Sequence, residues 1–338
     1  MIKRDNCFDF LRFLFAMIVV IGHLTCIAQI PQLQQFSFLF PTGLSVTGFF
    51  VISGFLIAQS YDYSTWKTYL IKRARRLLPA YVFVIVACTI GLSLVSTLTF
   101  KEYFTSIDTL KYLGANLCFL NFLHPSLPGV FEHPLINDNS VNPALWTLKI
   151  EVCFYLCVPI IIYILKRSKH PALWMASIYI LAVIYQHGCY YIESTYQAPI
   201  WGILARQLPG FMQYFIVGIS GYIYKDRFIR NKNLLLIPAL LIFVIEYIFG
   251  YEILRPLAFG IIILWCAWSL KALNNFSKYG DISYGIYIYH GPILKLLLCT
   301  GSFAAMGAIG GSIVYIASVL SAGWLSWHLL EKHALKRK

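Results

Sequence analysis

The chain has 338 residues, of which 59% are hydrophobic and 12% are charged, against about 25% charged residues in a soluble globular domain. That shortage of polar side chains excludes an ordinary water-soluble domain. The formal net charge is +13, but the basic residues lie in short segments between apolar stretches. This distribution argues against nucleic-acid binding and is typical of a membrane protein.

Ten stretches are predicted to cross a membrane, because a bilayer core requires about 20 mostly apolar residues per helix. Residues 110–123 are apolar but short, so we expect an interfacial or re-entrant segment there. The sequence predicts an all-α polytopic bundle of about ten transmembrane helices that forms one domain over residues 1–338. The expected spans lie near residues 8–30, 37–59, 80–98, 144–165, 172–190, 201–224, 233–250, 253–270, 281–300 and 305–330.

The distribution of Lys and Arg predicts that both termini are cytoplasmic. With the N-terminus inside, 20 of the 27 basic residues fall in cytoplasmic segments, and only Lys101 and Lys111 fall outside. The five others lie within spans: Arg12, Lys149, Arg206, Arg255 and Lys295. Counting residues 110–123 as a span would move the later basic loops outside, so the same rule argues against it.

The first span contains two residues that lipid would not tolerate, Arg12 and His23. They are eleven residues apart and therefore share one helix face, about 16 Å apart along the axis. Arg12 is near enough to the cytoplasmic end to extend its guanidinium to the surface. His23 is expected about 10 Å below the outer surface, either as a hydrogen-bonded core histidine or as a side chain that moves protons.

Glu151 is expected in the fourth span at a depth that matches His23. A carboxylate and an imidazole at one depth suggest an acid–base or orienting pair. A structural ion pair of Glu151 with Lys149 or Arg206 is the alternative. Arg206, at the start of the sixth span, could instead orient Glu151 or bind a sugar hydroxyl or carboxylate.

The densest basic cluster, residues 72–76, precedes the third span on the predicted cytoplasmic side. Such a cluster anchors a membrane protein and contacts anionic lipid. It could equally bind the phosphates of a cytoplasmic cofactor, because guanidinium groups match phosphate oxygens. The cluster does not decide between these functions.

Three further patterns have ordinary structural explanations. Residues 43–54 are rich in Gly and Ser, which is typical of close helix packing.

The ninth span carries Tyr284 and a mid-membrane histidine, His290, for which a packed polar face is the simplest account. The nine cysteines include no CxxC pair and no Cys/His metal spacing, so neither a metal site nor a disulfide framework is expected.

Taken together, six segments resemble the acyltransferase family 3 membrane proteins, and they occur in family order across nearly the whole chain. Each motif alone would be weak, whereas six in order are strong. They are Arg12-x10-His23, residues 48–55 (GFFVISGF), residues 73–79 (RARRLLP), residues 146–151 (WTLKIE), residues 206–209 (RQLP) and residues 282–290 (ISYGIYIYH).

The resemblance implies transfer of an acyl group, usually acetyl, from cytoplasmic acetyl-CoA to a carbohydrate hydroxyl. The chain looks like the stand-alone kind, as in the acetylases that modify lipopolysaccharide O-antigen, which implies a multi-pass protein of the bacterial inner membrane. Its expected partners are acetyl-CoA, a polysaccharide or lipid-linked glycan and membrane lipids. In the second motif the family usually has an acidic or polar residue before the phenylalanines; this chain reads SVTG at residues 45–48, so no role is assigned there.

These expectations assign residues to two ends of a transfer path. His23 is the expected catalytic residue, as a base or as an acetyl acceptor, with Glu151 orienting its imidazole. Acetyl-CoA, a polyanion, is expected at Arg12, Lys72, Arg73, Arg75 and Arg76. The residues expected to bind the acceptor sugar are Ser53, Trp146, Arg206, Tyr284 and His290.

A transporter or flippase of a glycan or lipid-linked sugar is the main alternative, because buried Arg, His and Glu also form proton relays. Such proteins often consist of two repeated halves, and no internal repeat is evident. A scaffolding membrane protein would have no need for three ionisable residues in the outer halves of its spans.

Overall fold

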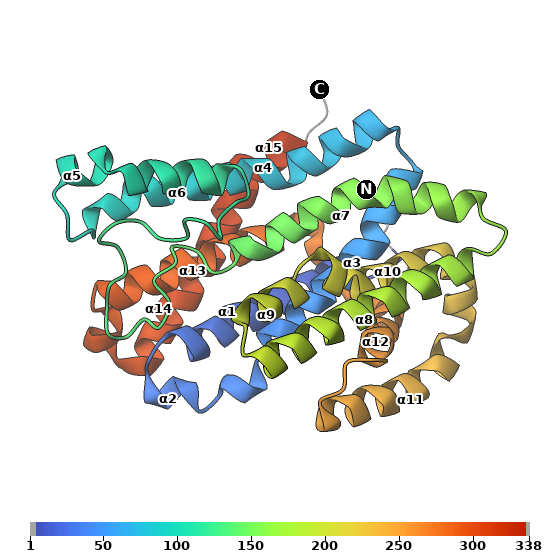
Figure 1. Cartoon of the computed structure of the whole chain (residues 1–338). Coiled ribbons are helices and arrows are strands. Elements are labelled where there is room, and N and C mark those ends of the chain that lie inside the picture. The colour runs from blue at the N-terminus through green and yellow to red at the C-terminus, as the bar shows by residue number, and fades with distance from the viewer. Residues whose placement is uncertain (1–4, 336–338) are drawn as a thin grey trace. The chain divides into compact units, whose positions relative to one another are not determined.

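A computed structural model describes residues 5–335, which fold into helices and connecting segments. These residues contain no β-strand beyond an isolated bridge between Ala28 and Ile136. The helices (Figure 1) are α1 (Phe8–Ile27), α2 (Pro31–Gln34), α3 (Thr42–Asp62), α4 (Trp66–Gly91), α5 (Phe100–Thr105), α6 (Ile107–Leu117), α7 (Leu145–Arg167), α8 (Pro171–Tyr196), α9 (Pro199–Ala205), α10 (Leu208–Ile223), α11 (Lys225–Phe249), α12 (Arg255–Ser269), α13 (Ser283–Cys299), α14 (Ser302–Ser326) and α15 (Lys332–Leu335).

Helices occupy all ten predicted positions, and the all-α polytopic class is confirmed. Seven of the described helices are long and apolar enough to cross a membrane: α1, α3, α4, α7, α8, α11 and α14. An eighth span results if α12 is joined to the short helical segment Lys271–Tyr279, from which it is bent by 72°. By length and composition alone, residues 5–335 thus supply seven or eight candidate spans, consistent with the predicted polytopic bundle.

The sixth predicted span, residues 201–224, is broken into α9 and α10. Gln207 is extended, with φ −104° and ψ −176°, and Pro209 follows in the first turn of α10. Proline has no N–H to donate and fits the first turn of a helix, where that donor is not needed. α10 therefore begins anew and reaches only 16 residues.

The segment 110–123 does not form a full-length span, in agreement with the sequence. α6 has 11 residues, or about 16 Å of helix. Tyr81 of α4 anchors its end by donating a hydrogen bond to the Asn116 carbonyl over 2.6 Å and by stacking on Phe119. Five basic residues used for the predicted orientation lie outside the described residues: Lys3, Arg4, Lys336, Arg337 and Lys338.

The chain divides into two compact units built from alternating segments. Unit 1 comprises Met1–Arg12, Val46–Leu70 and Ile150–Phe276, and unit 2 comprises Phe13–Ser45, Ile71–Lys149 and Ser277–Lys338. Helices α1, α3, α4 and α7 contribute residues to both units. Because the segments interleave along the chain, the single domain over residues 1–338 stays a prediction.

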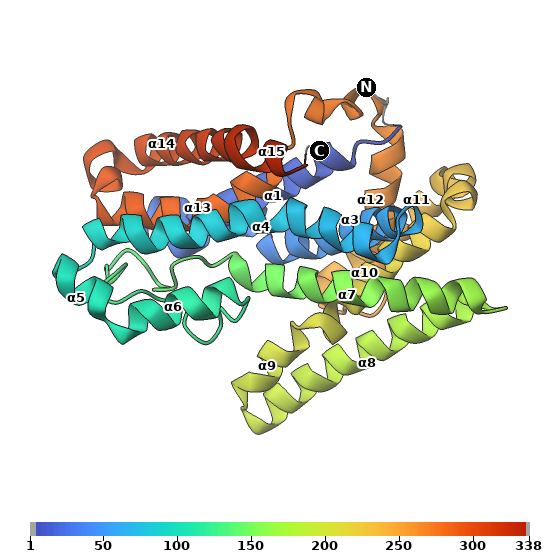
Figure 2. The same ribbon diagram turned by 90° about the horizontal axis from the view of Figure 1, so that it is seen from above.

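In unit 1, α8 packs along α10 and α11 packs along α12 (Figures 1 and 2). The small residues of α3 allow a close approach to α10, as the sequence predicted. A Cβ at Gly54 would lie 2.2 Å from the Phe215 carbonyl oxygen, and one at Gly218 would lie 2.0 Å from the Val51 carbonyl oxygen. Contact this close between backbones requires glycine on both helices.

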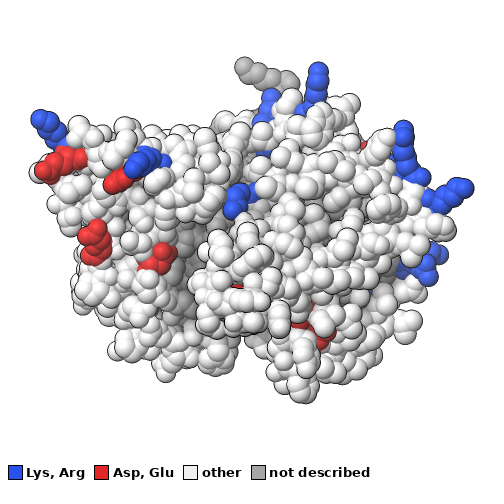
Figure 3. Space-filling model, in the orientation of Figure 1, with Lys and Arg blue, Asp and Glu red and all other residues white. Residues whose placement is uncertain are grey.

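In unit 2, α13 and α14 form a helical hairpin (Figures 1 and 2). Gly285 and Gly323 allow these helices to touch, since a Cβ at Gly285 would lie 2.8 Å from the Gly323 Cα. Charged side chains are sparse over the face drawn in Figure 3, as expected for a chain with so few of them.

Candidate active site

The predicted catalytic histidine is hydrogen-bonded to a second histidine within unit 2. His23 lies in α1, a single unbroken helix that also carries Arg12, as the sequence predicted. Its Nδ1 is 2.6 Å from Nε2 of His290 on α13. His290 is completely buried, whereas His23 is partly exposed.

The hydrogen bonds determine which nitrogen atoms of this pair carry protons. His290 Nδ1 lies 2.7 Å from the Tyr287 carbonyl oxygen, which can only accept, so this nitrogen carries the proton of the neutral ring. His290 Nε2 is then an acceptor, and His23 Nδ1 must donate to it. The unprotonated nitrogen of His23 is therefore Nε2, which has no hydrogen-bond partner among the described residues. This arrangement leaves a lone pair available as a base or nucleophile.

A proline explains how the segment that precedes α7 attaches to α13. Pro292 lies inside α13 and has no N–H to donate to the Ile288 carbonyl one turn earlier. Asn142 supplies the missing donor, with its Nδ2 2.8 Å from that carbonyl oxygen. Asn142 is itself buried, so both polar groups are satisfied.

The same outer segment is also fastened to α1. Asn137 donates to the Cys26 carbonyl over 3.0 Å, and the Gln29 amide donates to the Leu135 carbonyl over 3.0 Å. Residues 135–142, here called the outer clamp, thus bind both helices of the histidine pair. Because the clamp bonds to the end of α1 and to α13, it fixes the spacing of the two imidazole rings.

A buried ion pair completes the outer clamp. Lys295 of α13 is completely buried, and its Nζ lies 2.9 Å from Asp138 Oδ2. The same ammonium group donates to the carbonyl and the hydroxyl oxygens of Ser140. Burial raises the pKa of the Asp138 carboxyl, but the hydrogen bonds from Ser140 and the charge of Lys295 leave it below its ordinary value. The carboxylate is therefore charged at neutral pH.

Glu151 has a different neighbour from the one that the sequence suggested. It lies on α7 in unit 1, and its Oε1 accepts a hydrogen bond from Tyr155 over 2.5 Å. Its alternative ion-pair partner, Arg206, instead donates from Nε to the Gly202 carbonyl over 3.2 Å. The orienting position at His23 Nδ1, which was assigned to Glu151, is occupied by His290. His290 is accordingly placed as a positioning residue rather than as a sugar ligand.

Arg76, one of the residues expected to bind acetyl-CoA, belongs to a network of ion pairs inside unit 2. Its guanidinium lies 2.6 Å from Asp281 and 3.3 Å from Glu331. Glu331 is completely buried and also accepts a hydrogen bond from Ser326. A guanidinium that already neutralises two carboxylates has little charge left for a phosphate, so Arg76 connects α4 to the C-terminal helices.

The other predicted donor-side residues lie on α4 and α1. Lys72 and Arg73 are partly exposed and Arg75 is exposed, so phosphate groups can reach this part of α4. Arg12 is paired with Asp9 of α1 at 3.8 Å. The basic residues that remain accessible fit a polyanion better than Arg76 does.

The remaining predicted sugar ligands are spread over both units. Tyr284 donates its hydroxyl to the Leu77 carbonyl over 2.9 Å, and Arg76 lies over its ring. Tyr284 therefore packs α13 against α4, and its assignment to the acceptor sugar stays a prediction. Trp146 lies in the first turn of α7 in unit 2 and Ser53 lies on α3 in unit 1, each partly exposed.

The sequence did not predict that Lys295 and Asp138 pair with each other beside the two histidines. Both were visible as charged residues, one inside the ninth span and one in the long outer segment. A lysine five residues beyond His290 in an apolar span was the available signal, because such a charge requires a partner. The partner could not be chosen from several acidic residues of the outer segment.

Long apolar helices and a partly exposed imidazole with an unprotonated nitrogen define a polytopic membrane protein that carries an internal base. Comparison with known proteins specifies the class. Residues 5–328 match the family model of the acyltransferase domain, and the chain belongs to acyltransferase family 3. It is therefore an acyltransferase.

Two relatives align over nearly their whole length. An O-acetyl transferase of Shigella phage Sf6 is 26% identical over 346 residues, which cover 99% of this chain and 97% of the relative. Nodulation protein 10 of Rhizobium leguminosarum bv. viciae is 26% identical over 380 residues, which cover 98% of this chain and 93% of the relative. No solved structure matches the chain.

Proposed function

We propose that this acyltransferase moves an acetyl group from cytoplasmic acetyl-CoA to a sugar hydroxyl of a cell-surface polysaccharide, specifically lipopolysaccharide O-antigen, in a bacterial inner membrane. The observation that carries the proposal is the unpartnered Nε2 of His23, held by the bond from Nδ1 to His290. The name of the Shigella phage relative supports acetyl as the group transferred. The resemblance to stand-alone O-antigen acetylases supports the acceptor.

The chemistry requires one base and one fixed tautomer. In direct transfer, His23 Nε2 takes the proton of the sugar hydroxyl as its oxygen attacks the thioester carbonyl. The new C–O bond forms, the C–S bond breaks, and the proton passes from the imidazolium to the CoA thiolate. His290 accepts a hydrogen bond from His23 throughout, so it stabilises the imidazolium and keeps Nε2 aimed at the reacting atoms.

A covalent route uses the same atom. His23 Nε2 would attack the thioester carbonyl, so that a C–N bond forms, the C–S bond breaks and CoA leaves as its thiolate. The sugar oxygen would then attack the same carbonyl and break the C–N bond, and its proton would pass through the freed Nε2 to the CoA thiolate. Rapid quenching of a reaction with labelled acetyl-CoA, followed by peptide mapping, distinguishes the routes. Label on the peptide that contains His23 supports the covalent route, and its absence at every time point supports direct transfer.

The donor is expected at the accessible basic residues of α4. Lys72, Arg73 and Arg75 can pair with the phosphates of CoA, since guanidinium groups bind phosphate oxygens bidentately. Arg12, on the predicted cytoplasmic end of α1, is placed with them. Glu151, whose carboxylate accepts the Tyr155 hydroxyl, stays a candidate catalytic residue that acts in unit 1.

The decisive experiment follows labelled acetyl groups from acetyl-CoA into polysaccharide in isolated membranes. His23→Ala should lower incorporation by about 10²- to 10⁴-fold, the usual contribution of a general base. His170→Ala, at an exposed position just before α8, is the matched control and should keep full activity. Equal incorporation by both variants would refute the role of His23.

A second variant tests the positioning role of His290. His290→Ala should lower kcat and change the pH–rate profile, because His23 would lose the group that fixes its tautomer. A merely structural role would lower the amount of folded protein and leave the profile of the remainder unchanged. If the membranes instead transported an unmodified glycan and no product carried label, the result would favour the alternative function, a transporter or flippase of a glycan.

A further inference from the structure

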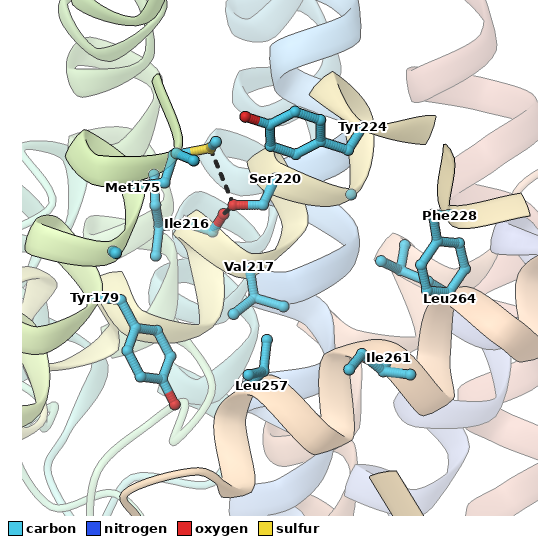
Figure 4. Close-up of a pocket in the computed structure, with 13 residues that line it drawn as sticks. Met175, Tyr179, Ile216, Val217, Ser220, Tyr224, Phe228, Leu257, Ile261 and Leu264 are labelled. Carbon is cyan, nitrogen blue, oxygen red and sulfur yellow. Dashed lines mark hydrogen bonds between the residues drawn. The ribbon is translucent and has the colours of Figure 1, made fainter. Parts of the chain in front are cut away.

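A groove of about 360 Å³ lies within unit 1; neither histidine of the pair lines it, and no step of acyl transfer uses it. It runs between α8, α10, α11 and α12 (Figure 4). On α8 its lining extends from Ala172 to Tyr179, or about 10 Å along the helix.

The hydroxyl groups of Tyr179, Ser220 and Tyr224 are the polar side-chain groups in the lining of the groove. Ser220 points into it, but its hydroxyl donates to the Ile216 carbonyl over 2.8 Å and contacts the sulfur of Met175 at 3.1 Å (Figure 4). The Tyr179 hydroxyl donates to the Ile253 carbonyl over 2.6 Å. Because the hydroxyls of Ser220 and Tyr179 already have partners, the groove favours an apolar occupant.

The surroundings of the groove are those of a surface that faces hydrocarbon. The adjoining α8 and α11 expose large apolar side chains, which a membrane would cover. These side chains include Leu173, Ile180, Leu181 and Ile184 on α8, and Leu234, Ile237, Leu241 and Val244 on α11. An occupant can enter from the membrane without crossing water.

One end of the groove is basic. Tyr224 and Phe228 line that end, and Lys225 lies between them at the first position of α11. Lys225 precedes Phe228 by three residues, so it shares the helix face that lines the groove, whereas Asp226 is fully exposed on another face. Ala172 lines the groove at the first turn of the 26-residue α8, whose N-terminus also favours negative charge.

We propose that this groove binds one acyl chain of an anionic membrane phospholipid, with the lipid phosphate at Lys225. The apolar lining holds the chain, and the ammonium group together with the first turn of α8 holds the phosphate. The basic segments at residues 166–169 and 225–232 place this end on the cytoplasmic side in the predicted orientation. Anionic headgroups are available in that leaflet. The proposal does not depend on the identity of the acetyl donor or the glycan.

Native mass spectrometry of the full-length protein tests this site. The protein is exchanged into micelles with equal amounts of phosphatidylglycerol and phosphatidylcholine of one chain length. The wild type should retain one lipid with about a five-fold preference for phosphatidylglycerol, the effect of one basic residue near a headgroup. Retention of both lipids in equal amounts, or of neither, would overturn the proposal.

Two matched pairs of variants locate the lipid. Ala176→Trp fills the groove from α8 and should abolish retention, whereas Ser177→Trp adds the same ring at an exposed position outside the lining and should preserve it. Lys225→Gln should remove the headgroup preference, whereas Arg230→Gln removes one charge from another face of α11 and should keep it. Size-exclusion profiles confirm folding in each variant. Equal behaviour within either pair would place the lipid elsewhere and refute the site.

Discussion

Replacing either residue of the ion pair between Lys295 and Asp138 should destabilise the protein, but the two replacements should lower the free energy of unfolding by different amounts. Lys295 is completely buried, whereas the side chain of Asp138 keeps 40% of its surface exposed. Asp138→Asn leaves a buried ammonium without its counter-charge, which costs at most about 3–5 kcal/mol of stability. Lys295→Met leaves a carboxylate that water can reach, so the loss approaches about 1.5–3 kcal/mol, the contribution of a charged hydrogen bond.

The prediction is tested by unfolding midpoints of the purified protein in detergent. We expect Asp138→Asn to lower the midpoint more than Lys295→Met does. The double variant should resemble Lys295→Met, because removing the ammonium removes the penalty that Asp138→Asn creates. A double variant whose effect equals the sum of the two single effects would show that the groups do not interact. A larger effect of Lys295→Met would refute the argument from exposure.

The same pair has a predictable pH dependence. Burial raises the pKa of Asp138, but the hydrogen bonds from Ser140 and the charge of Lys295 outweigh it. The pKa in the folded protein is therefore below its ordinary value of 3.8. A depressed carboxyl pKa contributes stability that is fully present above the unfolded value and is lost as the pH falls through the folded value. The difference in midpoint between the wild type and Asp138→Asn should therefore be constant near neutrality and shrink only in acid below about pH 4.

Two further substitutions separate structural from functional roles. Arg76→Gln should cost about 3–5 kcal/mol in unfolding experiments, because the buried Glu331 would lose the guanidinium that neutralises it; Arg75→Gln, at an exposed position, should leave the midpoint unchanged and raise the KM for acetyl-CoA. Gly54→Ala should sharply reduce the yield of folded protein in detergent, because its Cβ would lie 2.2 Å from a backbone oxygen, whereas Gly43→Ala on the same helix meets nothing within 4 Å and should be tolerated. A stable Arg76→Gln protein, or equal yields of the two alanine variants, would contradict these assignments.

The linear arrangement of helices could be predicted from the sequence because lipid imposes length and apolarity on every span. Expected helices such as 8–30 and 144–165 correspond to α1 and α7 with small shifts at their ends. The break at Gln207 was missed because an apolar stretch hides a local change in backbone direction. The conformation of that residue, followed by Pro209, ends one helix and begins another.

The candidate site could be predicted in part. His23 stood out because an imidazole in an apolar span requires a reason to be there. Its partner could not be identified in this way, since His290 is 267 residues away and Glu151 was an equally reasonable choice at the same predicted depth. Hydrogen-bond distance between two helices depends on their packing, which hydropathy does not contain.

The sequence by itself therefore determined the class of protein, the family motifs and the residues that could carry charge or protons within the membrane. Only the tertiary structure decided which of these groups meet. It placed His290 on His23, Asp138 on Lys295, and Arg76 between two carboxylates. Burial makes each unpaired polar group costly, but many pairings could relieve that cost. The close approach of particular helices selects one of them.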